Sequence, residues 1–135
     1  MKKNLVWMIA AMVFFSCKKD EKIDPQLNAF ATFQGKYLVC DSIVTTANGT
    51  TTTQVIGKGK GADITFGLYG NLEIFTTPTT NYNYQFESPD KVYYWQTNYD
   101  SNQFYTIQSM GGNKIVLLMN DTATGNVLVE YFTAE

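Results

Sequence analysis

From Tyr37 onward, apolar and polar side chains alternate along the chain with a period of two. The clearest runs are 62–68 and 82–87, where apolar residues are separated by single polar or small ones. This period is typical of a strand with one buried face, and the other segments are rich in β-branched and aromatic residues. The pattern predicts eight or nine strands among nine candidates: Lys36–Thr45, Thr51–Ile56, Ala62–Leu68, Leu72–Thr77, Tyr82–Glu87, Lys91–Thr97, Gln103–Ser109, Lys114–Asn120 and Val127–Thr133.

Short turn signals separate these strands. Asn48-Gly49 is the strongest hairpin signal, and further Gly- and Asn-containing turns follow at intervals of roughly ten residues. Because no crossover helices are available between strands, we expect an up-and-down antiparallel meander. Closure of the meander into an all-β barrel would remove its two exposed edges. An eight-stranded barrel is either filled by side chains or holds one small ligand; a two-sheet β-sandwich is the alternative.

A short helix precedes the first strand. Asp24 is suited to the N-cap and Pro25 to the first helical position. Leu27, Phe30 and Ala31 then form one apolar stripe at helical spacing. The sequence predicts a helix of about two turns.

The N-terminal segment has the organisation of a secretory signal. A basic start is followed by Leu5–Phe15, eleven residues without a charge, and then by Ser16-Cys17. Eleven residues are too few to span a bilayer, which takes about 20. We therefore expect a secretory signal peptide at 1–16, a tether at 17–24 and one barrel domain at 25–135.

The end of this segment, Phe14-Phe15-Ser16-Cys17, resembles the lipobox of bacterial lipoproteins, including those of Bacteroidetes-type bacteria. The resemblance implies that Cys17 carries acyl chains and anchors the protein in the outer membrane. Each buried methylene contributes about 0.8 kcal/mol, so two or three chains hold a protein firmly. Lys19-Asp20-Glu21 resembles the signal that sends such lipoproteins to the outer face; a solvated tether is the alternative.

The composition of the chain excludes several classes of functional site. The chain has no His, and its formal net charge is −2. It therefore lacks a Ser-His-Asp triad, a Cys-His pair and a His-based metal site, and its charge does not favour nucleic acid. We expect no catalysis, no cofactor, no metal and no nucleic-acid partner.

The second cysteine, Cys40, has no partner if Cys17 carries lipid. A reactive thiol needs a base or an electropositive setting, and no His supplies one. We expect Cys40 to be a small buried hydrophobic residue.

A second resemblance concerns the domain itself. Phe33-Gln34-Gly35-Lys36-Tyr37 resembles the Gly-x-Trp signature of lipocalins, with Tyr37 in the place of Trp. Tyr105-Thr106-Ile107, the Leu-rich segment 114–118 and Glu130-Tyr131-Phe132 are similar to small lipocalin-like lipoproteins of Bacteroidetes-type bacteria. The resemblance covers about residues 30–135. It implies a lipocalin-like barrel.

Nine aromatic residues crowd between Tyr82 and Tyr105. Alternation places Tyr94 on the face opposite to Tyr93 and Trp95, so aromatic side chains occupy both faces of the sheet. Tyr and Trp join an apolar body to a polar tip, which suits amphipathic ligands and partner surfaces; core packing with cross-strand pairs is the alternative. The candidate ligand-binding residues are Tyr82, Tyr84, Phe86, Tyr94, Trp95 and Phe104.

Two tripeptides resemble the acceptor for O-glycans in Bacteroidetes-type bacteria. They are Asp41-Ser42-Ile43 and Asp121-Thr122-Ala123. The candidate acceptors are therefore Ser42 and Thr122, and the expected loop position of Thr122 makes it the better one.

Together these features predict an outer-membrane lipoprotein, monomeric and anchored by lipid, on either the periplasmic or the external face. Its barrel is expected to bind a small apolar or amphipathic ligand or a partner surface. The alternative is a structural or adhesive cell-surface module with a filled core. A ligand-sized cavity would favour the first hypothesis and a solid interior the second.

Overall fold

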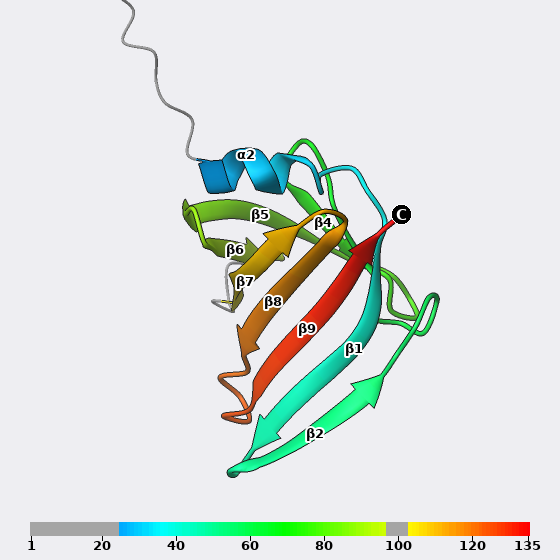
Figure 1. Ribbon diagram of the computed structural model, residues 1–135, viewed down its shortest axis with the longest axis vertical. Coiled ribbons are helices and arrows are strands. Elements are labelled where there is room, and N and C mark those ends of the chain that lie inside the picture. Colours follow the sequence, from blue (N-terminus) through cyan, green and yellow to red (C-terminus); the bar gives the residue numbers. More distant parts are fainter. Residues whose placement is uncertain (1–24, 97–102) are drawn as a thin grey trace, which may run out of the picture.

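The part of the chain that the structure describes forms a single antiparallel sheet with one short helix (Figure 1). The computed structural model describes residues 25–96 and 103–135. Helix α2 spans Pro25–Ala31. The strands are β1 Leu38–Ala47, β2 Thr50–Val55, β3 Ile64–Phe66, β4 Asn71–Ile74, β5 Thr80–Ser88, β6 Lys91–Trp95, β7 Gln103–Gly111, β8 Lys114–Asn120 and β9 Val127–Ala134. The predicted all-β fold with a short helix is confirmed.

The sheet closes into a barrel of eight strands. Strands β3 to β9 pair in sequence order, and β9 pairs with β1 from Leu38↔Ala134 to Thr46↔Val127. Strand β1 also contacts β3 through the pair Leu38↔Ile64, which completes the ring. This closure confirms the barrel and excludes the β-sandwich.

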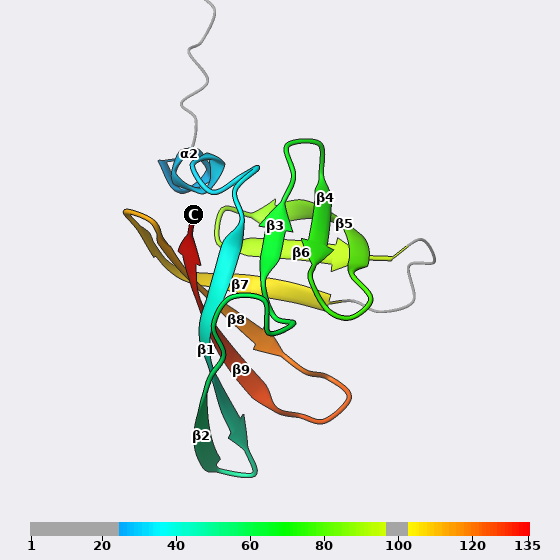
Figure 2. The same cartoon turned by 90° about the vertical axis from the view of Figure 1, so that its right-hand side faces the viewer.

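Strand β2 lies outside the ring, as Figure 2 shows. It pairs with the second half of β1, from Ser42↔Val55 to Ala47↔Thr50. All its residues are exposed, because a run of threonines offers no apolar face to bury. The turn before it has positive φ at Asn48 (49°) and Gly49 (76°), as a type I′ hairpin turn requires. The expected simple meander therefore skips one strand: β1 is followed in the barrel by β3.

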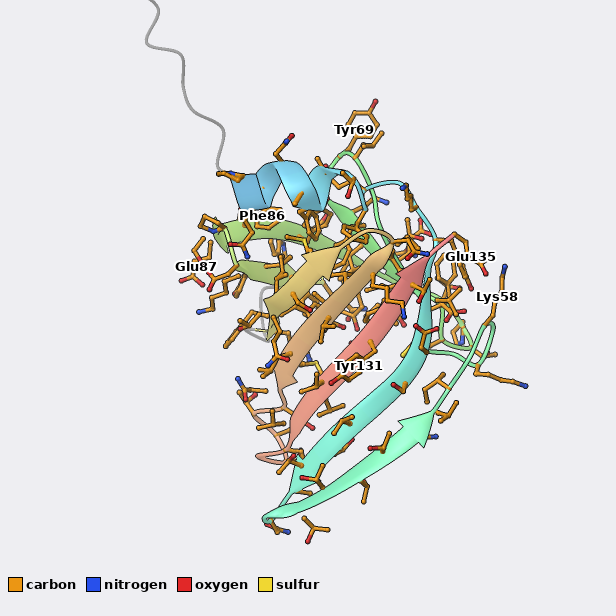
Figure 3. All side chains as sticks on the ribbon, viewed as in Figure 1. Lys58, Tyr69, Phe86, Glu87, Tyr131 and Glu135 are labelled. Atoms are coloured by element: carbon orange, nitrogen blue, oxygen red, sulfur yellow. The ribbon has the colours of Figure 1, made fainter. Side chains whose placement is uncertain are left out.

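Helix α2 closes one end of the barrel. Phe30 is 1% exposed, and its ring lies edge-on at 5.1 Å from Phe66 and 4.8 Å from Phe86. Figure 3 shows Phe86 directly beneath the helix. Of the predicted apolar stripe, Phe30 is buried and Leu27 is half-buried, whereas Ala31 is exposed.

The core fills the part of the barrel next to the helix. The predicted inward positions of Phe66, Tyr84 and Phe86 are confirmed: the first two are 0% and 7% exposed, and Phe86 packs against the same cluster. The hydroxyl of Tyr84 donates to the carbonyl of Gly67 at 2.7 Å and accepts from Gln34 at 2.7 Å. Tyr84 therefore has its polar tip satisfied inside the closed end.

One carboxylate lies fully buried at the seam between β1 and β3. Asp63 is 0% exposed. It accepts hydrogen bonds from the Tyr37 hydroxyl at 2.7 Å, the Cys40 amide at 2.8 Å and the Gly59 amide at 2.6 Å. Burial alone would raise the pKa of Asp63, but these bonds and the nearby Lys58 charge lower it below 3.8. Asp63 is therefore an ionised structural group.

Within the described residues, α2 is the one α-helix, and no helix there has the length and apolarity needed to cross a membrane.

We expect Phe66→Ala to lower the free energy of unfolding by about 3–5 kcal/mol, because it removes a buried ring and leaves a cavity. Thermal and denaturant melts would measure the loss. Gln85→Ala, on the exposed face of β5, is the control and should melt as the wild type does. Equal melts for both variants would contradict the inward position of Phe66.

Candidate functional site

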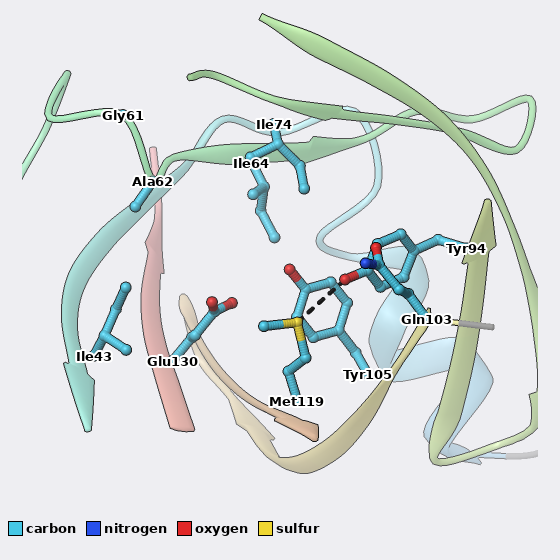
Figure 4. A pocket seen from close by; sticks show the side chains of 10 residues that line it. All are labelled: Ile43, Gly61, Ala62, Ile64, Ile74, Tyr94, Gln103, Tyr105, Met119 and Glu130. Carbon is cyan, nitrogen blue, oxygen red and sulfur yellow. Dashed lines mark hydrogen bonds between the residues drawn. The ribbon is translucent and has the colours of Figure 1, made fainter. Parts of the chain in front are cut away.

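A cavity lies in the barrel interior beyond the filled core, with a volume of about 320 Å³ (Figure 4). Its walls come from seven barrel strands and from the segment before β3. Most lining side chains are aliphatic or aromatic, with two polar side chains from β7 and β9. The lining residues are Ile43, Gly61, Ala62, Ile64, Ile74, Tyr94, Gln103, Tyr105, Met119 and Glu130.

The cavity occupies the half of the barrel farther from α2. Along β7, Ile107 and Tyr105 both belong to the core cluster, but only Tyr105, two positions farther from the helix, also borders the cavity. The same step separates Leu117 from Met119 on β8. Successive inward residues of a strand lie on one face, so each strand contributes first to the core and then to the cavity.

Glu130 is the ionisable carboxyl group in this lining. It pairs with Ile43 on β1 and with the buried Leu117 on β8, which places its side chain on the inward face of β9. Figure 4 shows its carboxylate directed into the cavity. Burial raises the pKa of Glu130 to about 7, and a hydrogen-bonding interaction with the Tyr105 hydroxyl partly offsets this rise. Close to neutral pH, this group therefore changes between an acid and a carboxylate.

Two tyrosines form the aromatic wall beside Glu130. The rings of Tyr94 and Tyr105 stack with centroids 4.9 Å apart and an interplanar angle of 19°. The Tyr94 hydroxyl donates to the Met119 sulfur at 3.3 Å. Burial raises the pKa of both hydroxyls. For Tyr94, a hydrogen bond with Tyr105 lowers the pKa by a smaller amount. Both stay protonated at neutral pH.

Of the six aromatic residues predicted for ligand binding, Tyr94 lines this cavity. Tyr82 lies behind it, with ring centroids 5.3 Å apart and planes at 90°. Tyr84 and Phe86 pack at the closed end against Phe30, at 6.4 Å and 4.8 Å. These side chains support the wall and the core; they do not border the cavity.

The remaining two candidates point to the outside of the barrel. Trp95 is half-buried and lies 5.6 Å from the Tyr93 ring. Phe104 is half-buried, with the Lys91 ammonium 4.2 Å above its ring. The predicted opposition of Tyr94 to Tyr93 and Trp95 is thus observed, and it separates the predicted ligand set between two faces.

Sequence reasoning missed Glu130, Tyr105, Gln103 and Met119 as cavity residues. A signal for Glu130 was present: in the last strand, Leu128, Glu130 and Phe132 occupy alternate positions. A charged residue in the apolar register of a strand indicates either a register error or a polar site in the interior.

A second hollow of about 290 Å³ borders the β8–β9 loop and shares Gln103 and Met119 with the cavity. Thr122 lies at its rim and is exposed. Ser42 is half-buried on β1, opposite Tyr131 of β9. The exposure of Thr122 is consistent with its being the better glycan candidate. The predicted lipid-attachment residue, Cys17, lies outside the described residues.

Cys40 is fully buried and free. Burial, with smaller effects from nearby carboxylates, raises its pKa to about 12. The thiol is therefore protonated and inert, as the sequence predicted for a buried hydrophobic position. Among the described residues, no group of three or more His, Cys, Asp or Glu side chains is placed to hold a metal ion.

The raised pKa of Glu130 predicts a loss of stability on going from acid to neutral pH. The folded state holds this proton up to about pH 7, whereas the unfolded state releases it near 4.5. The wild type therefore loses about 3 kcal/mol of unfolding free energy between those pH values.

In Glu130→Gln this loss should be absent, so the variant should gain stability relative to the wild type as pH rises from 4.5 to 7. Melts across this range measure the difference. Glu87→Gln, an exposed carboxyl group on β5, should follow the wild-type profile. Parallel profiles for wild type and Glu130→Gln would contradict the raised pKa of this half-buried, inward-facing carboxyl group.

Comparison of the chain with protein-family models, curated proteins and solved structures gives no match. The barrel and its cavity are therefore the observations on which a functional proposal rests.

Proposed function

We propose that this protein is an outer-membrane lipoprotein, anchored through Cys17, whose lipocalin-like barrel binds a small apolar or amphipathic ligand without transforming it. The observation that carries the proposal is the cavity of about 320 Å³ inside the barrel. Its wall is mostly apolar, with a few polar groups at defined positions. This combination is typical of small-molecule sites.

The size of the cavity limits the ligand. Small-molecule pockets span about 300–1,000 Å³, so a volume of about 320 Å³ is at the lower end. It equals the volume of about ten water molecules at roughly 30 Å³ each. The ligand is therefore expected to have on the order of ten non-hydrogen atoms.

The interior supports the first of the two functional hypotheses drawn from the sequence. A structural or adhesive module with a filled core predicts a solid barrel. Here the core fills the end beneath α2, and a cavity occupies the remainder. The cavity favours ligand binding over a purely structural role.

The surroundings of the cavity support binding rather than catalysis. Among the described residues, its lining holds one carboxyl group and no nucleophile with an adjacent base. Cys40 belongs to the packed core and its thiol is protonated. The low net charge of −2 does not favour nucleic acid as a partner, and we propose a monomer whose membrane contact is its lipid.

Filling the cavity should remove ligand binding while preserving the fold. Ala62 projects into the cavity from the segment before β3 (Figure 4), so Ala62→Phe should weaken binding of a neutral probe, 2-phenylethanol, by at least about tenfold. Calorimetric titration measures the affinity, and native mass spectrometry of protein from its own host detects a retained ligand as added mass. Thr53→Phe on exposed β2 is the control. Unchanged affinity in Ala62→Phe would place binding elsewhere.

The anchor is tested separately. Metabolic labelling with an alkyne fatty acid should tag the wild type and should not tag Cys17→Ala, because the acylated sulfur is absent. The variant should also leave the membrane fraction, since acyl burial holds the protein there. Equal labelling of the two proteins would refute the lipid anchor.

A further inference from the structure

Glu130 is a charged residue at a position where the strand otherwise turns apolar side chains inward. Its neighbours on the inward face of β9 are Leu128 and Phe132, and Phe132 is 1% exposed. Removing a carboxylate from water is unfavourable unless a cation or hydrogen bonds compensate for it. An apolar residue here would extend the core, so this carboxyl group costs stability that the fold alone does not require.

The described part of the chain supplies no cation to Glu130. The two ion pairs among the described residues join Lys58 to Glu135 and Lys91 to Glu87, and both lie on the outside of the protein. Figure 3 shows Lys58 and Glu135 together at the barrel surface. The cavity lining contains no lysine, and the whole chain contains no His. The partner of Glu130 among these described residues is the Tyr105 hydroxyl, so none of them supplies a counter-ion for the negative charge.

The walls next to Glu130 are also suited to a positive group. The stacked rings of Tyr94 and Tyr105 lie beside it, and aromatic faces attract cations through their quadrupoles. On the other side, Ile64 and Ile74 offer aliphatic surface (Figure 4). The cavity thus has one acidic point, an aromatic wall and an apolar remainder.

We propose that the ligand of this cavity is a small organic cation: a primary ammonium group on an apolar body, with the ammonium bound by the Glu130 carboxylate. The apolar body would pack on Ile64 and Ile74, and the Tyr94–Tyr105 pair would flank the charged end. Charge-assisted hydrogen bonds to a carboxylate are stronger than neutral ones. This inference rests on the proposed binding function and adds the chemical class of the ligand.

The affinity for such a cation should depend on pH through Glu130. The group is protonated in the empty cavity below about pH 7, and the carboxylate is the form that binds a cation. Glu130 acts electrostatically on Cys40 from β1, Tyr94 from β6 and Tyr105 from β7, and burial raises the pKa of each well above neutral. Its β8 neighbours, Leu117 and Met119, do not titrate. Affinity should therefore fall about tenfold from pH 8 to pH 6, as the competent fraction falls.

The test uses three probes of matched shape: phenethylammonium, neutral 2-phenylethanol and anionic 3-phenylpropionate. Each is titrated calorimetrically into the full-length mature protein in a neutral detergent, with a detergent titration subtracted. At pH 8, wild type should bind phenethylammonium about tenfold or more tightly than 2-phenylethanol, and 3-phenylpropionate most weakly. Glu130→Gln should lose this preference and keep its affinity for 2-phenylethanol, whereas Glu87→Gln should behave as wild type.

The outcomes separate this inference from the proposed function. Three results would overturn the cation proposal and leave apolar ligand binding standing. They are equal binding of the ammonium and the alcohol, a preference for 3-phenylpropionate, and a preference for the ammonium that survives in Glu130→Gln. A preference for the alcohol at pH 6 and pH 8 alike would mean that Glu130 acts as a neutral hydrogen-bond donor, which also overturns it. Failure of all three probes to bind wild type would overturn both.

Discussion

The barrel depends on a buried carboxylate at its narrowest seam. Strands β1 and β3 meet through one residue pair, Leu38↔Ile64, because the far half of β1 is already paired with β2. Asp63 completes this seam by accepting hydrogen bonds from the Cys40 amide of β1, from Gly59 in the preceding loop and from the Tyr37 hydroxyl. A side chain thus supplies the acceptors that a longer strand would have offered from its backbone.

The same division of β1 accounts for the cavity. Near α2 the strands are paired all round, and large side chains such as Phe30, Phe66 and Phe132 fill the space. Beyond Leu38, the edge of β1 that meets β3 pairs with β2 instead, and Gly61 and Ala62 line the cavity beside it. These residues carry little or no side chain, so the interior is hollow where the ring of strands is least complete.

Much of the fold was predictable from the sequence, and the site was not. Alternation and turn signals are local properties, so they located the strands and the Asn48-Gly49 hairpin correctly. The exclusion of β2 from the ring depends on how β1 pairs with later strands of the chain. Local sequence patterns do not determine this long-range pairing. The predicted aromatic set is dispersed over the barrel for a related reason: alternation separates Tyr94 from Trp95 and Phe104, but it cannot say which inward positions meet a void. Tyr84 fills space beside Phe30, whereas Glu130, in the apolar register of the last strand, borders the cavity.

The position of α2 has a geometric consequence for a lipid-anchored protein. The helix begins at Pro25 and covers the end of the barrel opposite to the cavity. Eight residues of tether, 17–24, reach at most about 29 Å when fully extended. If Cys17 carries the lipid, this reach places the tether at the closed end and leaves the cavity at the untethered end of the barrel. Its ligand would then be drawn from solution rather than from the lipid phase beneath it.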